Sequence, residues 1–226
     1  MRPTAFVLPI LSVLVAGCAT VTAPVGGALP AVGVADDMAR IAPVAPAVPG
    51  GWRAVISSED RARLHNWRES WVAALDRANR SSAQAKIAAE GALLHPDRAV
   101  PGVVPPVGAY RCRTTKLGAR GPGLLDYVAY PAFDCRIAAG PGGTLRLTKL
   151  NGSQRPVGVL YPQNDLRMVF LGTMMLGDER RALEYGRDPE RDLVGGLERI
   201  GPNRWRLLLP APRWESLFDV MELVPA

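Results

Sequence analysis

The second half of the chain is a succession of short apolar segments separated by turn-forming residues, and this pattern limits the fold more than any other sequence feature. Each segment has the length and the β-branched and aromatic content of a strand. Asn151-Gly152 is the clearest turn, because this dipeptide favours a tight β-hairpin. The segments are AYRCRTTKLG (109–118), YVAY (127–130), DCRIAAG (134–140), TLRLTKL (144–150), VGVLY (157–161), RMVFLGTMM (167–175), RWRLLL (204–209) and LFDVMELV (217–224). We therefore expect an antiparallel curved sheet or a small β-barrel over residues 108–226.

Two helices are expected ahead of the strands, over residues 57–95. Ser57 or Ser58 can cap the first helix, and a second, shorter helix over residues 82–94 would end before Pro96. An apolar stripe at helical spacing runs along the first helix through Leu64, Trp67, Trp71, Leu75 and Ala78. Such a stripe favours core packing for its two tryptophans over a ligand platform. The expected fold class is α+β, with an N-terminal helical hairpin packed on the sheet or barrel.

Residues 177–201, GDERRALEYGRDPERDLVGGLERIG, differ from the segments on either side. Asp178 can cap a turn of helix that continues to Tyr185, and Gly186 suits a left-handed stop. The remaining residues mix charges of both signs. We expect this part of the region to be solvated.

The first 17 residues are predicted to be a signal peptide. Arg2 is followed by an apolar run over residues 5–15, which is too short to span a bilayer as a helix. The run ends in Val-Ala-Gly before Cys18, which resembles the bacterial lipobox, in which the cysteine thiol receives a diacylglycerol. By resemblance to lipoprotein sorting, Ala19 in the next position favours the outer membrane. Ordinary cleavage nearby, with an incidental cysteine, is the alternative.

Residues 18–51 are expected to form a flexible tether after the lipidated cysteine. This stretch has no aromatic residue, few charges, and proline or glycine at short intervals. Prolines remove backbone donors and glycines raise chain entropy, so a packed core is not expected. A single folded domain is then predicted over residues 52–226.

The chain has three cysteines, and lipidation of Cys18 would leave Cys112 and Cys135. These two lie in neighbouring predicted strands, and an exported protein meets an oxidising environment. We predict a disulfide between them. The alternatives are a thiol nucleophile, which would need one of the chain's two histidines, and a redox pair, which usually takes the C-x-x-C spacing that this chain lacks.

The net charge is +6, and the only lysines are Lys86, Lys116 and Lys149. The arginines are scattered among acidic residues, and no basic block with interleaved aromatics occurs, so a nucleic-acid partner is not expected. Four arginines alternate with apolar residues along two predicted strands: Arg111, Arg113, Arg204 and Arg206. If they point into a barrel mouth, they could hold a carboxylate or an anionic headgroup. A solvent-facing sheet surface paired with acids is the alternative.

No residue carries a recognisable catalytic pattern, so no catalytic residue, metal site or cofactor is predicted. The two histidines, His65 and His95, have no partner at metal-ligand spacing. Signatures of serine hydrolases and of nucleotide-binding loops are missing. Glu215, Asp219 and Glu222 could furnish an acid/base pair of the kind that glycosidases use. Such pairs also arise by chance among 21 acidic residues.

Four stretches carry a family resemblance: EDRARLHNWRESWVAALDRA, the cysteine pair GAYRCR…FDCR, LERIGPNRWRLLLP and ESLFDVMELVP. Together they resemble an uncharacterised domain-of-unknown-function family of exported Gram-negative bacterial proteins. The resemblance covers residues 57–225. It implies export, and it brings no catalytic or binding residues with it.

The sequence therefore predicts a lipoprotein anchored in the outer membrane and facing the periplasm, with a non-catalytic binding or envelope-structural module. Its partners would be the membrane, through the lipid anchor, and an envelope lipid, glycan or protein. One alternative is an inhibitor of cell-wall hydrolases, because AYRCR loosely resembles the first cysteine strand of such small disulfide-stapled barrels. Another is a carboxylate-dependent hydrolase of envelope polymers.

Overall fold

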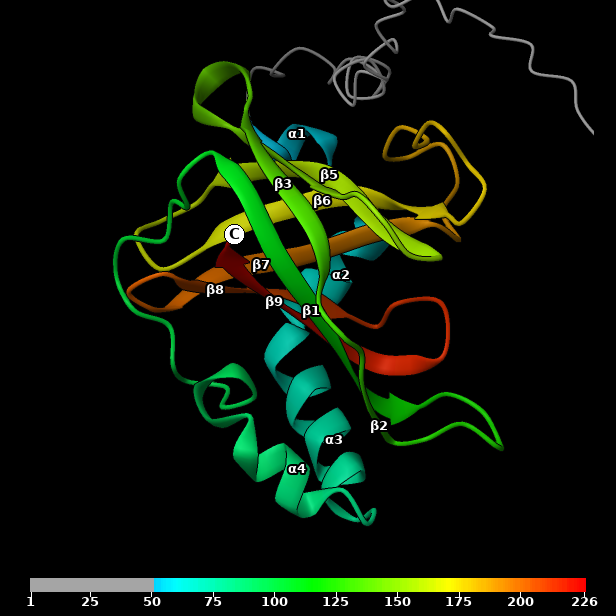
Figure 1. Ribbon diagram of the computed structural model, residues 1–226. Coiled ribbons are helices and arrows are strands. Elements are labelled where there is room, and N and C mark those ends of the chain that lie inside the picture. Colours follow the sequence, from blue (N-terminus) through cyan, green and yellow to red (C-terminus); the bar gives the residue numbers. More distant parts are fainter. Residues whose placement is uncertain (1–50) are drawn as a thin grey trace, which may run out of the picture.

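The computed structural model describes residues 51–226, and Figure 1 shows their arrangement. The predicted signal peptide, Cys18 and the tether lie outside the described residues, apart from Gly51. No helix among residues 51–226 has both the length and the apolar character needed to cross a membrane.

The helices come first along the chain, as expected, although the first predicted helix is divided. The helical elements are α1 (Trp52–Val55), α2 (Ser58–His65), α3 (Trp67–Asn79), α4 (Gln84–Ala89) and the 3-10 turn η2 (Gly91–Leu93). Ser57 caps α2, because its hydroxyl accepts a hydrogen bond from the amide of Asp60 at 3.1 Å. Asn66 separates α2 from α3. The separation is slight, since the Asn66 amide donates to Ala62 and its carbonyl accepts from Ser70, both at 3.0 Å.

The strands close into a barrel, which is one of the two arrangements that the sequence predicts. They are β1 (Gly108–Ala119), β2 (Tyr127–Ala129), β3 (Phe133–Ala139), β4 (Leu145–Lys149), β5 (Gln154–Pro162), β6 (Met168–Leu176), β7 (Asp192–Gly201), β8 (Arg204–Pro210) and β9 (Ser216–Pro225). All pairings are antiparallel, and β3 to β9 follow in chain order after β1. The barrel closes because β9 pairs with β1 from Tyr110↔Pro225 to Ala119↔Ser216.

The wall is interrupted where β1 changes its neighbour. The first part of β1, Gly108–Cys112, pairs with β3, whereas Thr115–Leu117 pairs with β2. Residues 130–132 separate β2 from β3, and Pro131 among them has no amide hydrogen to donate to a ladder. Tyr130 and Phe133, which lie at this interruption, also line a cavity.

The interior of the barrel is filled with apolar side chains over most of its length. At the end where β1 begins, Trp205 Nε1 donates to the carbonyl of Val103 at 2.8 Å, and the Tyr110 hydroxyl donates to the carbonyl of Pro106 at 2.7 Å. The predicted disulfide between Cys112 and Cys135 is confirmed, and both cysteines are buried in this interior cluster. The end near Trp205 is therefore closed by packed side chains.

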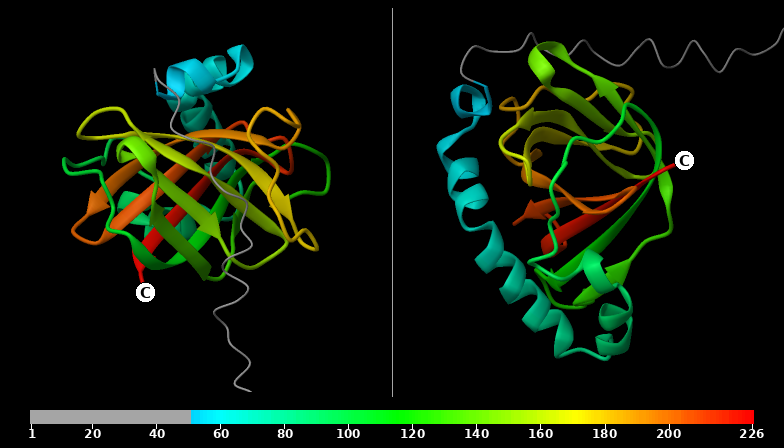
Figure 2. Two further views of the ribbon diagram at one scale, coloured as in Figure 1. Left: turned by 90° about the horizontal axis from the view of Figure 1, so that it is seen from above. Right: turned by 90° about the vertical axis from the view of Figure 1, so that its left-hand side faces the viewer.

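The helices cover one outer side of the barrel, as Figure 2 shows. Trp71 of α3 is fully buried and stacks on Phe218 of β9, with ring centroids 5.3 Å apart. Trp67 is partly buried and carries the guanidinium of Arg167 over its ring. Trp52 packs against β6 and β7. Trp71 thus has the core role that its helical spacing predicts.

The prediction for residues 177–201 is wrong in two respects. Residues 178–185 form no helix, and residues 192–201 form β7, whose side chains are almost all buried. The strand was hidden by its glycines and charges. A Cβ on Gly195 would lie 2.1 Å from the carbonyl oxygen of Leu208, so only glycine fits there, and the Glu198 carboxylate is neutralised by arginines.

Candidate functional site

A cavity of about 130 Å³ lies at the interruption in the barrel wall, at the end opposite Trp205. Its rim carries the exposed residues Tyr130, Ser153 and Glu215. The remaining lining residues come from seven strands: Thr114, Lys116, Phe133, Lys149, Gln154, Pro156, Met174, Leu209, Asp219 and Met221. The floor is largely apolar, and four charged side chains converge on it.

Lys149, the last residue of β4, is a buried cation with no carboxylate partner. Its side chain lies over the Phe133 ring, 3.9 Å from the centroid, and its Nζ donates to the carbonyl of Gln154 at 2.9 Å. Among the described residues, no carboxylate forms a salt bridge with it. Burial, followed by repulsion from Lys116 and Arg155 and opposed by the attraction of Asp219, lowers the pKa of Lys149 to about 8. At neutral pH the Lys149 amine is therefore still mostly protonated, but it binds its proton more weakly than an ordinary lysine does.

Lys116 of β1 is the second cavity lysine, and its charge is balanced. Its Nζ lies 3.1 Å from Asp219 and 3.3 Å from Glu215. Burial lowers the pKa of Lys116, but the two carboxylates raise it by more, so the net pKa lies above its ordinary value. Lys116 remains a fixed ammonium that draws both carboxylates into the cavity.

Asp219 and Glu215 differ in their surroundings although they share Lys116. Asp219 of β9 is buried and accepts a hydrogen bond from the hydroxyl of Ser216. Burial raises the pKa of Asp219, against the opposing effects of Lys116 and Ser216. Glu215 is on the loop before β9, with its side chain 42% exposed. The structure therefore brings together two of the carboxylates that the sequence suggests as an acid/base pair.

Glu215 adopts a backbone conformation that is unusual for a residue with a side chain. Its φ is 65°, in the left-handed region, where a non-glycine residue is strained. The conformation is fixed because the Arg120 amide donates to the Glu215 carbonyl at 2.9 Å, and the Ser216 amide donates to the Trp214 carbonyl at 2.7 Å. The strained turn holds the Glu215 carboxylate over the cavity mouth, where an incoming ligand would meet it.

The four arginines predicted to bind a ligand lie elsewhere, on the outer surface of the barrel. Arg111 pairs with Asp134, and Arg204 pairs with Glu222 at 2.5 Å. Arg113 contacts Glu222 at 2.9 Å and Glu90 at 2.6 Å. These side chains do not line the cavity. Their proposed role in ligand binding stays a prediction, and what the structure describes for them is pairing with carboxylates of the protein.

Arg206, the fourth of these arginines, is fully buried between the barrel and the helices. Its guanidinium contacts Glu198 at 2.7 Å. It also donates to four backbone carbonyls of the segment after α4, those of Ala92, Leu93, His95 and Pro96. Its guanidinium carbon is 4.5 Å from the centroid of the Trp71 ring. Arg206 therefore joins the helical segment to the barrel.

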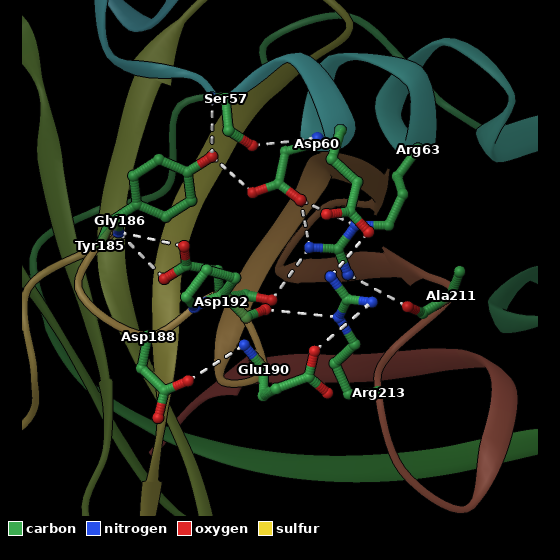
Figure 3. Close-up of polar contacts among 12 residues, drawn as sticks. Ser57, Asp60, Arg63, Tyr185, Gly186, Asp188, Glu190, Asp192, Ala211 and Arg213 are labelled. Carbon is green, nitrogen blue, oxygen red and sulfur yellow. Dashed lines mark hydrogen bonds and ion pairs between the residues drawn. The ribbon is translucent and has the colours of Figure 1, made fainter.

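A second polar cluster, shown in Figure 3, fastens the loop after β6 to α2. The Arg63 guanidinium donates to the Asp60 carboxylate at 2.7 Å and to the backbone carbonyl of Asp192 at 3.0 Å. The Tyr185 hydroxyl donates to Asp60, and the Gly186 amide donates to the Asp192 carboxylate. Burial and the Asp60 carboxylate raise the pKa of Tyr185 to about 12. These groups satisfy one another, so we interpret the cluster as a structural latch.

The two histidines are not part of the cavity. His65 ends α2 and is exposed, and His95 is exposed after η2. Across residues 51–226, no three histidine, cysteine or acidic side chains lie together in a way that would hold a metal ion.

A comparison with protein families gives a match over residues 52–223, to a family described as a domain of unknown function, DUF4893. The chain belongs to this family. The match covers the helices and almost the whole barrel, and it agrees with the resemblance seen in the sequence. No curated protein and no solved structure matches the chain.

Sequence reasoning missed Lys116 and Lys149, although a signal was present. Only three of the chain's 27 basic residues are lysines, and two of these three line the cavity. Arginine stays protonated in proteins, whereas a buried lysine readily changes its pKa. In a chain whose other basic residues are all arginines, the few lysines are therefore candidates for a functional role.

Proposed function

We propose that this domain binds a small carboxylate in the cavity between β1, β4 and β9, and that it does so without catalysis. The observation that carries the proposal is Lys149, a buried ammonium that faces the cavity and has no carboxylate partner. A bound carboxylate would supply the missing counter-charge. Lys116, whose partner Glu215 is half-exposed at the rim, could exchange that partner for the ligand.

A buried cation without a counter-charge weakens a fold, and strongly perturbed ionisable groups cluster at functional sites. Arg206 differs in this respect, since Glu198 and backbone carbonyls balance it. This contrast supports a binding role for Lys149. A purely structural lysine would gain by pairing with a carboxylate, as Lys116 does.

The size of the cavity favours a small ligand. Pockets for drug-sized ligands occupy about 300–1,000 Å³, whereas this one has about 130 Å³. Apolar side chains fill the middle of the barrel beyond it. A lipid acyl chain would need that volume, so among the expected ligand classes a small anion suits the cavity best.

Binding can be tested by titrating the protein with acetate at pH 7 and following amide chemical shifts by NMR. We expect residues around Lys149 to shift in the wild type. Lys149→Met should weaken binding about tenfold or more, because a hydrogen bond to a charged group contributes about 1.5–3 kcal/mol. Lys86→Met, at an exposed lysine of α4, is the matched control and should bind as the wild type does. Equal affinity in the Lys149 and Lys86 variants would contradict the proposal.

We further propose that the domain is displayed by a lipoprotein, attached through Cys18 to the outer membrane and facing the periplasm. The support is the lipobox-like sequence around Cys18 and the stretch of proline and glycine after it. Several acyl chains on one residue would anchor the protein stably. Cys18→Ser should release the protein from membranes in cell fractionation with its disulfide intact. Retention of this variant in the membrane fraction would count against the anchor.

The hydrolase alternative has one specific observation in its favour, which is that Glu215 and Asp219 meet in one cavity. Burial raises the pKa of Asp219, as a general acid requires. However, both carboxylates are already held by Lys116, and the cavity is small for a unit of a polymer chain. We therefore expect Glu215→Gln to change the affinity for acetate and to have no effect on the hydrolysis of peptidoglycan fragments. Turnover of peptidoglycan fragments that depends on Glu215 would favour the hydrolase instead.

A further inference from the structure

We infer that Lys149 is a carbonyl-reactive amine, which forms a reversible imine with a small aldehyde or ketone admitted to the cavity. The inference rests on the proposed function in one respect, which is that the cavity admits a small ligand. It goes further by assigning a covalent step to one side chain and by naming the ligand class as carbonyl compounds, with 2-oxo acids as the members that also carry a carboxylate.

The position of Lys149 suits a nucleophile. Lys149 lines the cavity, and the hydrogen bond from its Nζ to the Gln154 carbonyl at 2.9 Å is the only one that the structure gives this side chain among the described residues. No ion pair has to be broken before the nitrogen can attack. The Phe133 ring supports the side chain from one side, which limits the orientations of the amine.

The environment also favours the neutral amine. With a pKa of about 8, about a tenth of Lys149 is unprotonated at pH 7, against a few in ten thousand for an ordinary lysine. Burial and the nearby Lys116 ammonium are the causes, and the same two effects activate lysines that form Schiff bases. Lys116 itself is held protonated by its two carboxylates.

The step balances with groups that the cavity contains. The neutral Lys149 nitrogen attacks the carbonyl carbon, a C–N bond forms, and the carbonyl oxygen takes a proton to give a carbinolamine. The nitrogen loses one proton as the carbinolamine forms. The C–O bond then breaks, the hydroxyl leaves with a second proton as water, and the nitrogen loses its remaining proton, so the two protons that the oxygen gains equal the two that the nitrogen loses. Glu215, half-exposed at the rim, can accept a proton from the nitrogen and return it to the oxygen. No oxidant or reductant takes part.

The scarcity of lysine makes the inference easy to test on the full chain in detergent. The protein is incubated with glyoxylate or with acetaldehyde at pH 7, imines are trapped with borohydride, and adducts are located by peptide mass spectrometry. We expect Lys149 to be labelled about tenfold or more faster than Lys86, which is exposed on α4, and Lys116 to be spared. The rate at Lys149 should level off above about pH 8.

Lys149→Arg is the matched variant, because it keeps the positive charge and removes the nucleophile. It should give no adduct at position 149. Equal labelling of Lys86 and Lys149 in the wild type would overturn the inference, since that is the behaviour of unselective surface amines.

The two proposals fail in different ways. Acetate binding without a trapped adduct on Lys149 would overturn the imine and leave carboxylate binding in place. A Lys149 adduct with acetaldehyde in a protein that does not bind acetate would support the reactive amine and overturn carboxylate binding.

Discussion

Arg206 and Lys149 are both buried cations, yet their surroundings differ in whether they neutralise the positive charge. Arg206 lies between the barrel and the helices and is fully buried, with Glu198 and four backbone carbonyls around it. Lys149 lies at the open end of the barrel, 5% exposed, with one backbone carbonyl and the face of a phenyl ring. The first charge is neutralised within the protein, and the second is not.

This difference distinguishes a buried charge that stabilises the fold from a buried charge that is available to a ligand. A buried ion whose partners are all internal holds two parts of a fold together, and removing it leaves those partners unsatisfied. A buried ion that faces a cavity without a counter-charge opposes folding, and its removal should relieve strain. Substitutions at the two sites should therefore change stability in opposite directions.

The largest effect is expected from Arg206→Met. Glu198 would lose its partner from β8, and the carbonyls after α4 would lose their donor. Removing one partner of a buried pair typically lowers the free energy of unfolding by about 3–5 kcal/mol. Urea denaturation followed by tryptophan fluorescence would measure it. A change below about 1 kcal/mol would mean that Arg167, the other partner of Glu198, is sufficient.

Asp219→Asn should have the next largest effect, a loss of about 2 kcal/mol in the free energy of unfolding. The variant keeps a side chain of the same shape but leaves Lys116 with Glu215 alone, and Glu215 is half-exposed. The same denaturation experiment applies. Unchanged stability would show that Asp219 carries little negative charge in the folded protein.

Lys149→Met should stabilise the protein by about 1–2 kcal/mol at pH 7, a figure discounted for partial solvation. Because the pKa of Lys149 is lowered to about 8 in the folded state, the unfolded chain binds more protons between about pH 8 and the ordinary lysine pKa of 10.5. The stability of the wild type therefore rises with pH across this window. The advantage of the variant should be full below pH 8 and should disappear above about pH 10.5. A gap that does not depend on pH would point to packing as its cause.

Arg111→Gln should have the smallest effect. Arg111 and Asp134 form a pair in which both side chains are about half-exposed, and such pairs contribute about 0.5 kcal/mol or less. Thermal unfolding at low and high salt would measure it. A loss above about 1 kcal/mol would show that the arginines outside the barrel have a larger structural role than their exposure indicates.

The strands and the disulfide could be predicted because their signals are local. Asn151-Gly152 marks the turn between β4 and β5, and β-branched or aromatic residues mark most of the strands. The division of the first helix at Asn66 could not be predicted, because the apolar stripe continues across it.

β7 shows where local signals fail. The letters DLVGGLERI contain two adjacent glycines and two acidic residues, which are typical of a loop. Gly195 is needed because the Leu208 backbone lies too close for any side chain, and Glu198 is tolerated because Arg206 and Arg167 meet it from other strands. Both reasons depend on residues that are distant in the sequence or on another strand.

The candidate site was only half visible from the sequence. Glu215 and Asp219 were candidate acids, but nothing local connects them with Lys116, about a hundred residues earlier, or with Lys149. Ligand binding was instead predicted for the arginines at alternating strand positions, and these lie on the outer face of the barrel strands. Which face points inward depends on how the barrel closes, and one residue of register reverses it.

The sequence by itself determined the fold class, the placement of helices before strands, most of the strands, the disulfide and the resemblance to the family, because residue chemistry and periodicity encode these features within short stretches. Only the tertiary structure decided that the sheet closes, that β1 pairs with β3 over its first part and with β2 further along, and that two lysines and two carboxylates share a cavity. The physical reason is that burial and charge pairing depend on neighbours in space. A lysine acquires an unusual pKa only when the fold removes its water and gives it no counter-ion.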